Sequence, residues 1–162
     1  RTSVAIIDNQ TTEDDLNNLS KDVFDYFGLG CRSVTKLYIE KGFDINSIFK
    51  SFYHAKEVMN HVKYMNNYDY NKAIYLLEDI SFLDNGFMIL RENENLHSPV
   101  SVVNYEYFEN IVELNEKLKY IHDEIQCRVG VGGITYGTAQ NPSLSDYADG
   151  VDTIQFLINN LN

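Results

Sequence analysis

The chain has 162 residues, of which 44% are hydrophobic and 23% charged, which suits one domain with a real core or a piece of a larger protein. Thirteen basic against twenty-four acidic residues give a net charge of −11, and without a basic stripe this excludes a nucleic-acid partner. No apolar run approaches the ~20 residues that span a bilayer, and no signal-peptide pattern is present. We therefore expect a cytoplasmic protein without a membrane span.

The first expected element is a core strand over residues 2–8, which contain the apolar run Val4–Ile7. The chain begins with Arg1 rather than Met, and we infer from this that a natural N-terminal part is missing. After the strand, Thr11 or Thr12 caps a helix whose apolar residues recur at helical spacing. Gly28 is expected to end this helix.

The middle of the chain predicts a strand at Val34–Ile39 and a second helix, capped by Asp44 or Asn46, that runs to about Val62. The tyrosine- and asparagine-rich stretch Tyr64–Tyr70 has the composition of a loop. Residues 71–77 fit a helix or a strand equally well.

The last part alternates short strands with helices. The expected elements are strands at Gly86–Leu90, Val100–Val103 and Ile125–Val131, and helices at Phe108–Ile121 and Thr153–Leu161. Such alternation predicts an α/β fold with a largely parallel sheet flanked by helices, in one folding unit over residues 1–162.

Cys31 is the best candidate for chemistry, because it follows Gly28-Leu29-Gly30 in the turn between the first helix and Val34. A thiolate attacks carbonyl carbon well, and backbone N–H groups beside it can stabilise the resulting oxyanion. The alternative is a small buried residue, the usual state of a free cysteine. Cys127 lies in a strand-like run, where filling the core explains it better. The two cysteines are compatible with one disulfide, but we favour the reduced state.

The histidines give no metal site, because His54 and His61 lie seven apart without a third ligand at zinc-like spacing. His97, in a loop beside Ser98 and Pro99, is the best candidate to pair with Cys31. Residues 130–133 superficially suggest a phosphate cradle, but a plain turn is favoured because neither the Rossmann spacing nor the Walker lysine is present.

Three stretches in order resemble the aldehyde dehydrogenase superfamily. They are Val4–Ile39, which contains Phe27-Gly28-Leu29-Gly30-Cys31-Arg32, then Glu94–Val103, and last Tyr136-Gly137-Thr138-Ala139-Gln140. Within that superfamily the chain is similar to fatty acyl-CoA reductases of the bacterial luminescence (LuxC) type. Further segments carrying this likeness are Asn67–Lys72, Phe82–Phe87 and Asp146–Asp152.

The resemblance implies a catalytic-domain segment in which Cys31 is the acyl-accepting nucleophile. Gly30, Cys31 and Arg32 would form the nucleophile loop and oxyanion site. The substrate would be a fatty acyl-CoA or acyl-enzyme thioester, reduced to an aldehyde with NADPH or NADH. The resemblance leaves a homo-oligomer open.

Other site residues follow by the same resemblance. His97, Ser98 and Tyr136 would line the substrate pocket. The family's ribose-binding glutamate aligns with Asn95, while Glu94 stands one place earlier, so these two are the candidate cofactor contacts. A general base, an oxyanion asparagine and the main cofactor-binding domain would all precede Arg1, so we expect this chain alone to be inactive as a reductase. The rival functions are a cysteine acyltransferase or thioesterase without nicotinamide, and a non-catalytic binding module.

Overall fold

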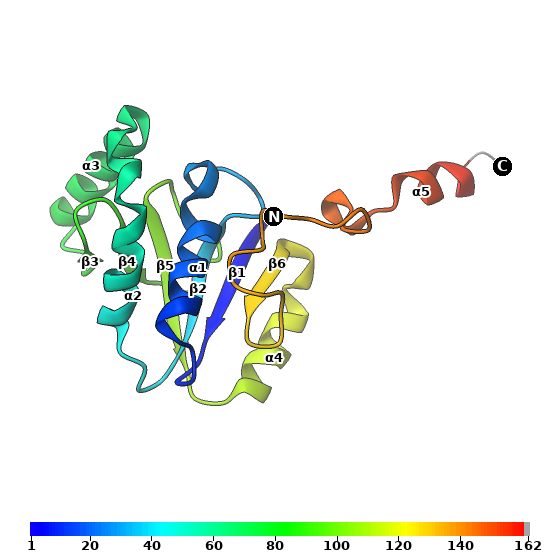
Figure 1. The fold of residues 1–162 in the computed structure, drawn as a ribbon, viewed down its shortest axis with the longest axis horizontal. Coiled ribbons are helices and arrows are strands. Elements are labelled where there is room, and N and C mark those ends of the chain that lie inside the picture. Colours follow the sequence, from blue (N-terminus) through cyan, green and yellow to red (C-terminus); the bar gives the residue numbers. More distant parts are fainter. Residues whose placement is uncertain (161–162) are drawn as a thin grey trace.

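A computed structural model describes residues 1–160. Its centre is a six-stranded sheet in the order β3-β4-β5-β2-β1-β6, in which β3 alone runs antiparallel to its neighbour (Figure 1). The strands are β1 (Thr2–Ile7), β2 (Val34–Glu40), β3 (Leu83–Asp84), β4 (Ile89–Glu92), β5 (Val102–Phe108) and β6 (Ile125–Gly130). The predicted α/β class with a largely parallel sheet is confirmed.

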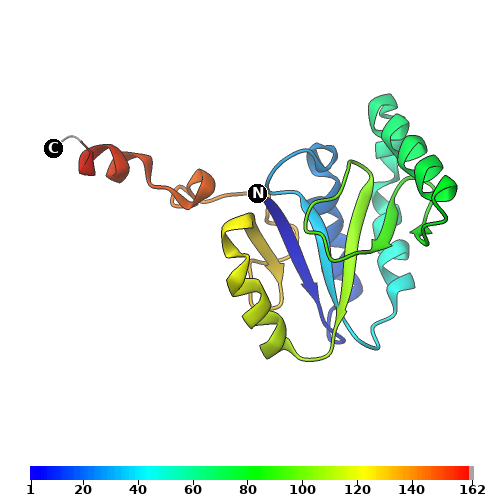
Figure 2. The same cartoon turned by 180° about the vertical axis from the view of Figure 1, so that it is seen from behind.

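Helices cover both faces of the sheet. The α-helices are α1 (Glu13–Phe24), α2 (Ile45–Phe52), α3 (Val62–Leu77), α4 (Ile111–Tyr120) and α5 (Thr153–Asn159). The short 3₁₀ helices are η1 (Asp25–Gly28), η2 (Tyr53–Asn60), η3 (His122–Glu124) and η4 (Ala148–Gly150). Helices α1 and α2 pack on one face, and α4 packs on the other (Figures 1 and 2). None of the described helices is both long and apolar enough to cross a membrane.

Strand β1 lies in the interior between β2 and β6, and all six of its residues are buried. Ala5 and Ile7 pack in the cluster under α1 and α2, whereas Val4 and Ile6 pack under α4. This two-sided burial explains why Val4–Ile7 is a continuous apolar run rather than an alternating pattern.

Helix α1 begins as predicted. The Thr12 hydroxyl accepts a bond from the backbone N–H of Asp15, and the Asp15 carboxylate accepts one from the Thr12 N–H, which completes a capping box. The helix ends at Phe24, earlier than the predicted end at Gly28. Tyr26 and Phe27 take left-handed backbone angles, and the Phe27 ring stacks on His61 with centroids 4.0 Å apart. The end of α1 at Phe24 is therefore followed directly by a tertiary contact, the stacking of Phe27 on His61.

The region after α2 corrects two predictions. The second helix does not run to Val62, because α2 ends at Phe52 and η2 follows. Tyr64–Tyr70 is not a loop but part of α3, and residues 71–77 complete that helix. The buried side chains of α3 are Tyr64, Tyr68, Asn71 and Tyr75, spaced four, three and four apart, which is one helical face.

The later strands are longer or shifted relative to prediction. Strand β4 begins at Ile89 rather than Gly86. Strand β5 continues to Phe108, where the predicted helix Phe108–Ile121 was expected to start. Asn110 caps α4 by accepting a bond from the Val112 N–H. Strand β6 matches the predicted Ile125–Val131 to within one residue.

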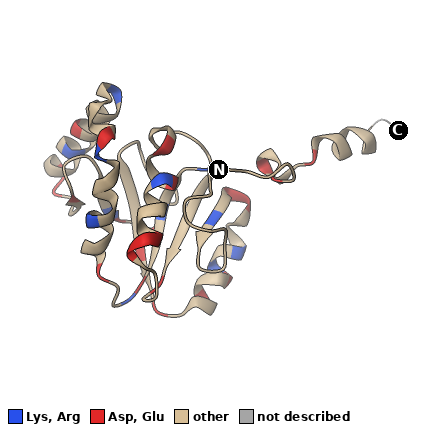
Figure 3. Ribbon diagram, in the orientation of Figure 1, with Lys and Arg blue, Asp and Glu red and all other residues tan. Residues whose placement is uncertain are grey.

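The last described residues form an arm that leaves the sheet near the N-terminus (Figures 1 and 2). Helix α5 confirms the predicted closing helix as far as Asn159; its predicted end at Leu161 lies outside the described residues. The described side chains of α5 are exposed, including Ile154 and Phe156. Basic residues are scattered over several helices, while acidic residues gather in the first turn of α1 (Figure 3).

Candidate functional site

Cys31 lies at the tip of a tight turn between η1 and β2. The N–H of Ser33 donates to the carbonyl of Gly30 at 2.9 Å, so Cys31 and Arg32 are the two central residues of a hydrogen-bonded β-turn. The Ser33 hydroxyl accepts a second bond from the Gly30 N–H at 3.3 Å. Cys31 itself is exposed. The turn holds the thiol at the amino ends of the parallel strands, open to solvent.

The two peptide groups on either side of the Cys31 Cα are both held through their carbonyls. The Gly30 carbonyl closes the turn, and the Cys31 carbonyl accepts a bond from the Ser3 hydroxyl at 3.0 Å. Within residues 1–160 the N–H groups of Cys31 and Arg32 have no hydrogen-bond acceptor. Two unpaired N–H groups beside an exposed thiol match what an oxyanion site requires.

Arg32 points its side chain away from this turn. Its Nε donates to the Ala139 carbonyl, and its Nη2 lies 3.9 Å from the Asp146 carboxylate. The guanidinium therefore ties the turn to the segment after β6. At the turn itself Arg32 therefore presents its backbone N–H rather than its guanidinium.

The segment after β6 is fixed in turn by Asp22 of α1. The buried Asp22 carboxylate accepts bonds from the backbone N–H groups of Gly137 at 2.6 Å and Ala139 at 2.9 Å. Burial raises the pKa of this carboxyl, although the two bonds act in the opposite direction. Asp22 thus holds in place the carbonyl of Ala139 that Arg32 binds.

Cys127 is near the turn but in a different environment. It is buried on β6, and its N–H donates to the same Ser3 hydroxyl at 3.1 Å. Burial raises the pKa of the Cys127 thiol, which disfavours the nucleophilic thiolate. Both cysteines are free thiols. A cavity of about 420 Å³ beside Cys127 is lined in part by Arg32, Asp146 and Tyr147.

The loop between β4 and β5 carries four predicted site residues. Its backbone is held against β2: the Thr35 hydroxyl donates to the Leu96 carbonyl at 2.9 Å, and the Ser98 hydroxyl lies 3.3 Å from the Thr35 carbonyl. Thr35 comes four residues after Cys31, so the structure brings Ser98 to the same end of β2. His97 is exposed, and within residues 1–160 no histidine is bonded to the Cys31 thiol.

The predicted cofactor contacts Glu94 and Asn95 are both exposed on this loop. The Asn95 N–H donates to the Asn93 side chain at 2.8 Å, and the Asn95 carbonyl accepts from Asn104 at 3.0 Å. The side chains of Glu94 and Asn95 make no hydrogen bond or ion pair with the described part of the chain. Neighbouring side chains therefore do not fix the orientation of the two predicted cofactor contacts. The described residues include no cluster of three or more metal-ligating side chains.

Tyr136 lies at the opposite end of β1 from Cys31. Its hydroxyl donates to the Ile6 carbonyl at 2.6 Å, whereas the Cys31 turn is bound to Ser3. Three residues of strand separate these points by about 10 Å. Burial raises the pKa of Tyr136 to about 12. The structure does not bring Tyr136 to the predicted nucleophile; it places this side chain against the carboxyl end of β1.

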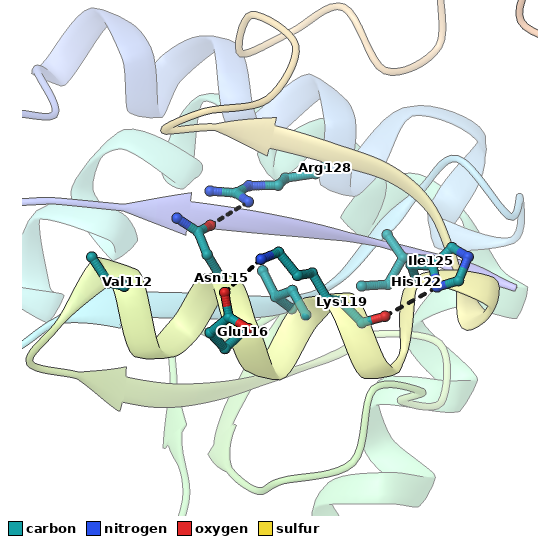
Figure 4. A pocket seen from close by; sticks show the side chains of 8 residues that line it. Val112, Asn115, Glu116, Lys119, His122, Ile125 and Arg128 are labelled. Carbon is teal, nitrogen blue, oxygen red and sulfur yellow. Dashed lines mark hydrogen bonds and ion pairs between the residues drawn. The ribbon is translucent and has the colours of Figure 1, made fainter.

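A second hollow, of about 680 Å³, lies between α4 and the start of β6 (Figure 4). Arg128 lines it and is held there by Asn115, with Nη1 and Oδ1 2.6 Å apart, and Lys119 pairs with Glu116. None of the predicted site residues lines this hollow. The candidate chemistry therefore stays at the Cys31 turn.

Sequence reasoning missed two residues that hold the site, Ser3 and Asp22. Each carried a signal: Ser3 is a polar residue inside an apolar strand, and Asp22 falls on the buried face of α1 between Leu19 and Val23. Buried polar groups need partners, so both positions pointed to specific bonds.

Comparisons with known proteins add little. No known family profile matches the chain, and no curated protein matches it. Among solved structures, the chain is similar to an NAD-dependent aldehyde dehydrogenase from Sinorhizobium meliloti, with a TM-score of 0.48 and 9% identity. The match covers 90% of this chain and 33% of that one, so the chain spans about a third of that protein's length. A likeness this distant carries no functional information.

Proposed function

We propose that this chain carries the acyl-accepting cysteine of an acyl-CoA reductase, with Cys31 as the nucleophile. The observation that carries the proposal is the turn itself. It presents an exposed thiol beside two backbone N–H groups that have no acceptor within residues 1–160, while both flanking carbonyls are bound. The resemblance of the Gly30-Cys31-Arg32 segment to the aldehyde dehydrogenase nucleophile loop supports the same assignment.

The chemistry at the turn is acyl transfer. The Cys31 thiolate attacks the thioester carbonyl, and the carbonyl oxygen becomes an oxyanion near the N–H groups of Cys31 and Arg32. When the tetrahedral intermediate collapses, the bond from carbon to the CoA sulfur breaks and CoA leaves as a thiolate with that electron pair. The product is an acyl-cysteine. NAD(P)H is the expected reductant of this intermediate.

A CoA-exchange assay tests this half-reaction. A long-chain fatty acyl-CoA is mixed with isotope-labelled CoA and the protein, because reversible acylation of Cys31 moves label into the acyl-CoA pool. We expect exchange in the wild type and in Cys127→Ala, and at least ~100-fold slower exchange in Cys31→Ala, since the nucleophile is gone. Exchange that survives in Cys31→Ala, or is absent from the folded wild type, overturns the proposal.

The same reactions separate the rival functions. An acyltransferase or thioesterase releases free fatty acid or passes the acyl group to another acceptor, and NAD(P)H has no effect on it. A reductase, when its nicotinamide site is complete, converts the acyl-cysteine to an aldehyde and oxidises NAD(P)H. With the 162-residue chain alone we expect exchange without NAD(P)H oxidation. Oxidation of NAD(P)H by this chain alone would contradict the expectation that it is inactive as a reductase.

A further inference from the structure

Ser3 is the only hydroxyl in residues 1–160 that bonds to the backbone of both cysteines. Its side chain is 0% exposed in the middle of the sheet. The hydroxyl donates to the Cys31 carbonyl at 3.0 Å and accepts from the Cys127 N–H at 3.1 Å. The hydroxyl therefore links the nucleophile turn to β6, 28 and 124 residues away from Ser3 in sequence.

Strand register is irregular on both sides of Ser3. Between β1 and β2 the register shifts between Ser3 and Val4, and between β1 and β6 it shifts between Thr2 and Val4. Such irregularities interrupt the regular ladder and leave backbone groups to find other partners. Here the Ser3 hydroxyl accepts a hydrogen bond from the Cys127 N–H, and the Ser3 N–H donates to the Ser33 carbonyl at 3.2 Å.

The hydrogen bond from the Ser3 hydroxyl to the Cys31 carbonyl also sets the direction of the Arg32 N–H. Peptide bonds in the described chain are trans, so the Cys31 carbonyl and the Arg32 N–H point in opposite directions. The carbonyl points inward, to the buried Ser3. The Arg32 N–H therefore points away from Ser3, and it has no acceptor within residues 1–160.

We propose that Ser3 is a positioning residue that aims the Arg32 N–H at the oxyanion formed on Cys31. This inference rests on the function proposed above and extends it to a residue that touches no substrate. Ser3 accepts from the Cys127 N–H, which fixes the direction of its own hydroxyl hydrogen toward the Cys31 carbonyl. The position of Ser3 in the fully buried strand β1 gives this bond a rigid base.

Two reactions of Cys31 test the proposal, because they differ in one respect. Acyl transfer forms an oxyanion, whereas alkylation by iodoacetamide does not. Ser3→Ala frees the Cys31–Arg32 peptide to rotate, so we expect kcat for CoA exchange to fall by at least ~10-fold with KM unchanged, below the full loss of an oxyanion donor. The rate of Cys31 alkylation, followed by peptide mass spectrometry, should stay within about 3-fold of the wild type.

The controls keep the outcomes distinct. Ser20→Ala removes another buried serine, whose hydroxyl donates to Asn17 within α1, and should leave both rates unchanged. Ser3→Thr keeps the hydroxyl and should retain most of the exchange. If Ser3→Ala does not fold, Ser3→Cys, similar in volume but weaker in hydrogen bonding, takes its place.

Three results overturn the assignment of Ser3. They are exchange at the wild-type rate in Ser3→Ala, an equal fall in exchange and alkylation, and a rise in KM alone. Absence of exchange in the wild type counts instead against the proposed function. Failure of the positioning role and failure of the acyl-transfer proposal are thus separable.

Discussion

Two cysteines that share one serine lie in different surroundings. Cys31 is exposed on a turn whose N–H groups have no acceptor within residues 1–160, whereas Cys127 is buried on a strand, and burial raises the pKa of its thiol. The prediction that Cys127 fills the core agrees with its burial. Sequence context separated the two residues because a glycine-rich turn and an apolar strand have different solvent exposure, which is a local property of the chain.

The ion-pair cluster on the α4 face shows what residue-level reasoning from sequence misses. Lys36, on central strand β2, is fully buried, and its ammonium lies 2.6 Å from the Glu106 carboxylate. The other Glu106 oxygen lies 2.6 Å from Lys117, which is half-exposed. Burial alone would raise the pKa of Glu106, but the bonds from Lys117 and Lys36 bring it below its ordinary 4.5.

Glu106→Gln should therefore destabilise the fold by about 3–5 kcal/mol at neutral pH, because it leaves the Lys36 ammonium buried without a counter-charge. A carboxyl with a lowered pKa in the folded state stabilises above its unfolded pKa, and this stability is lost as pH falls through the folded value. The difference between Glu106→Gln and the wild type should thus shrink below about pH 4.5.

Urea unfolding at several pH values measures this difference. Lys117→Met is the matched control, since it removes the exposed partner and should cost less than about 1 kcal/mol. Equal costs for the two variants, or a difference independent of pH, would refute the account of this cluster.

At the scale of elements, the sequence predicted best where one signal was strong and local. The caps at Thr12 and Asp44, each one of two predicted alternatives, and the strands β1, β2 and β6 were all placed to within about two residues. The prediction of an element was wrong where residue composition and the spacing of buried residues indicated different structures. The tyrosine and asparagine content of residues 64–70 indicated a loop. The buried residues of α3 lie at helical spacing, and burying this face stabilises the helix; they are Tyr64, Tyr68, Asn71 and Tyr75.

The cap of α1 gives a prediction at this scale. Thr12→Ala removes the side chain that accepts from the Asp15 N–H, so the free energy of unfolding should fall by about 1 kcal/mol. Thr12→Ser keeps the hydroxyl and should remain within a few tenths of the wild type. Thermal unfolding followed by circular dichroism checks both. Identical stabilities of the alanine and serine variants would show that the cap contributes nothing.

For the whole molecule, the order of strands and helices predicted the α/β class, but it did not reveal which residues meet at the site. Ser3, Cys31 and Cys127 come together only through the sheet order that places β1 between β2 and β6. Tyr136 shows the converse, since it follows β6 and folds back to the far end of β1. Contacts between distant segments depend on topology and register, which local patterns do not encode.

Mapping the acylated residue by mass spectrometry shows whether Cys31 accepts an acyl group. The protein is mixed with a long-chain fatty acyl-CoA, quenched in acid and digested, and the peptides are analysed by mass spectrometry with and without hydroxylamine, which cleaves thioesters. We predict one acyl group per chain, on the peptide that contains Cys31, removed by hydroxylamine and absent from Cys31→Ala. An adduct on Cys127, or none on the folded wild type, would contradict the account.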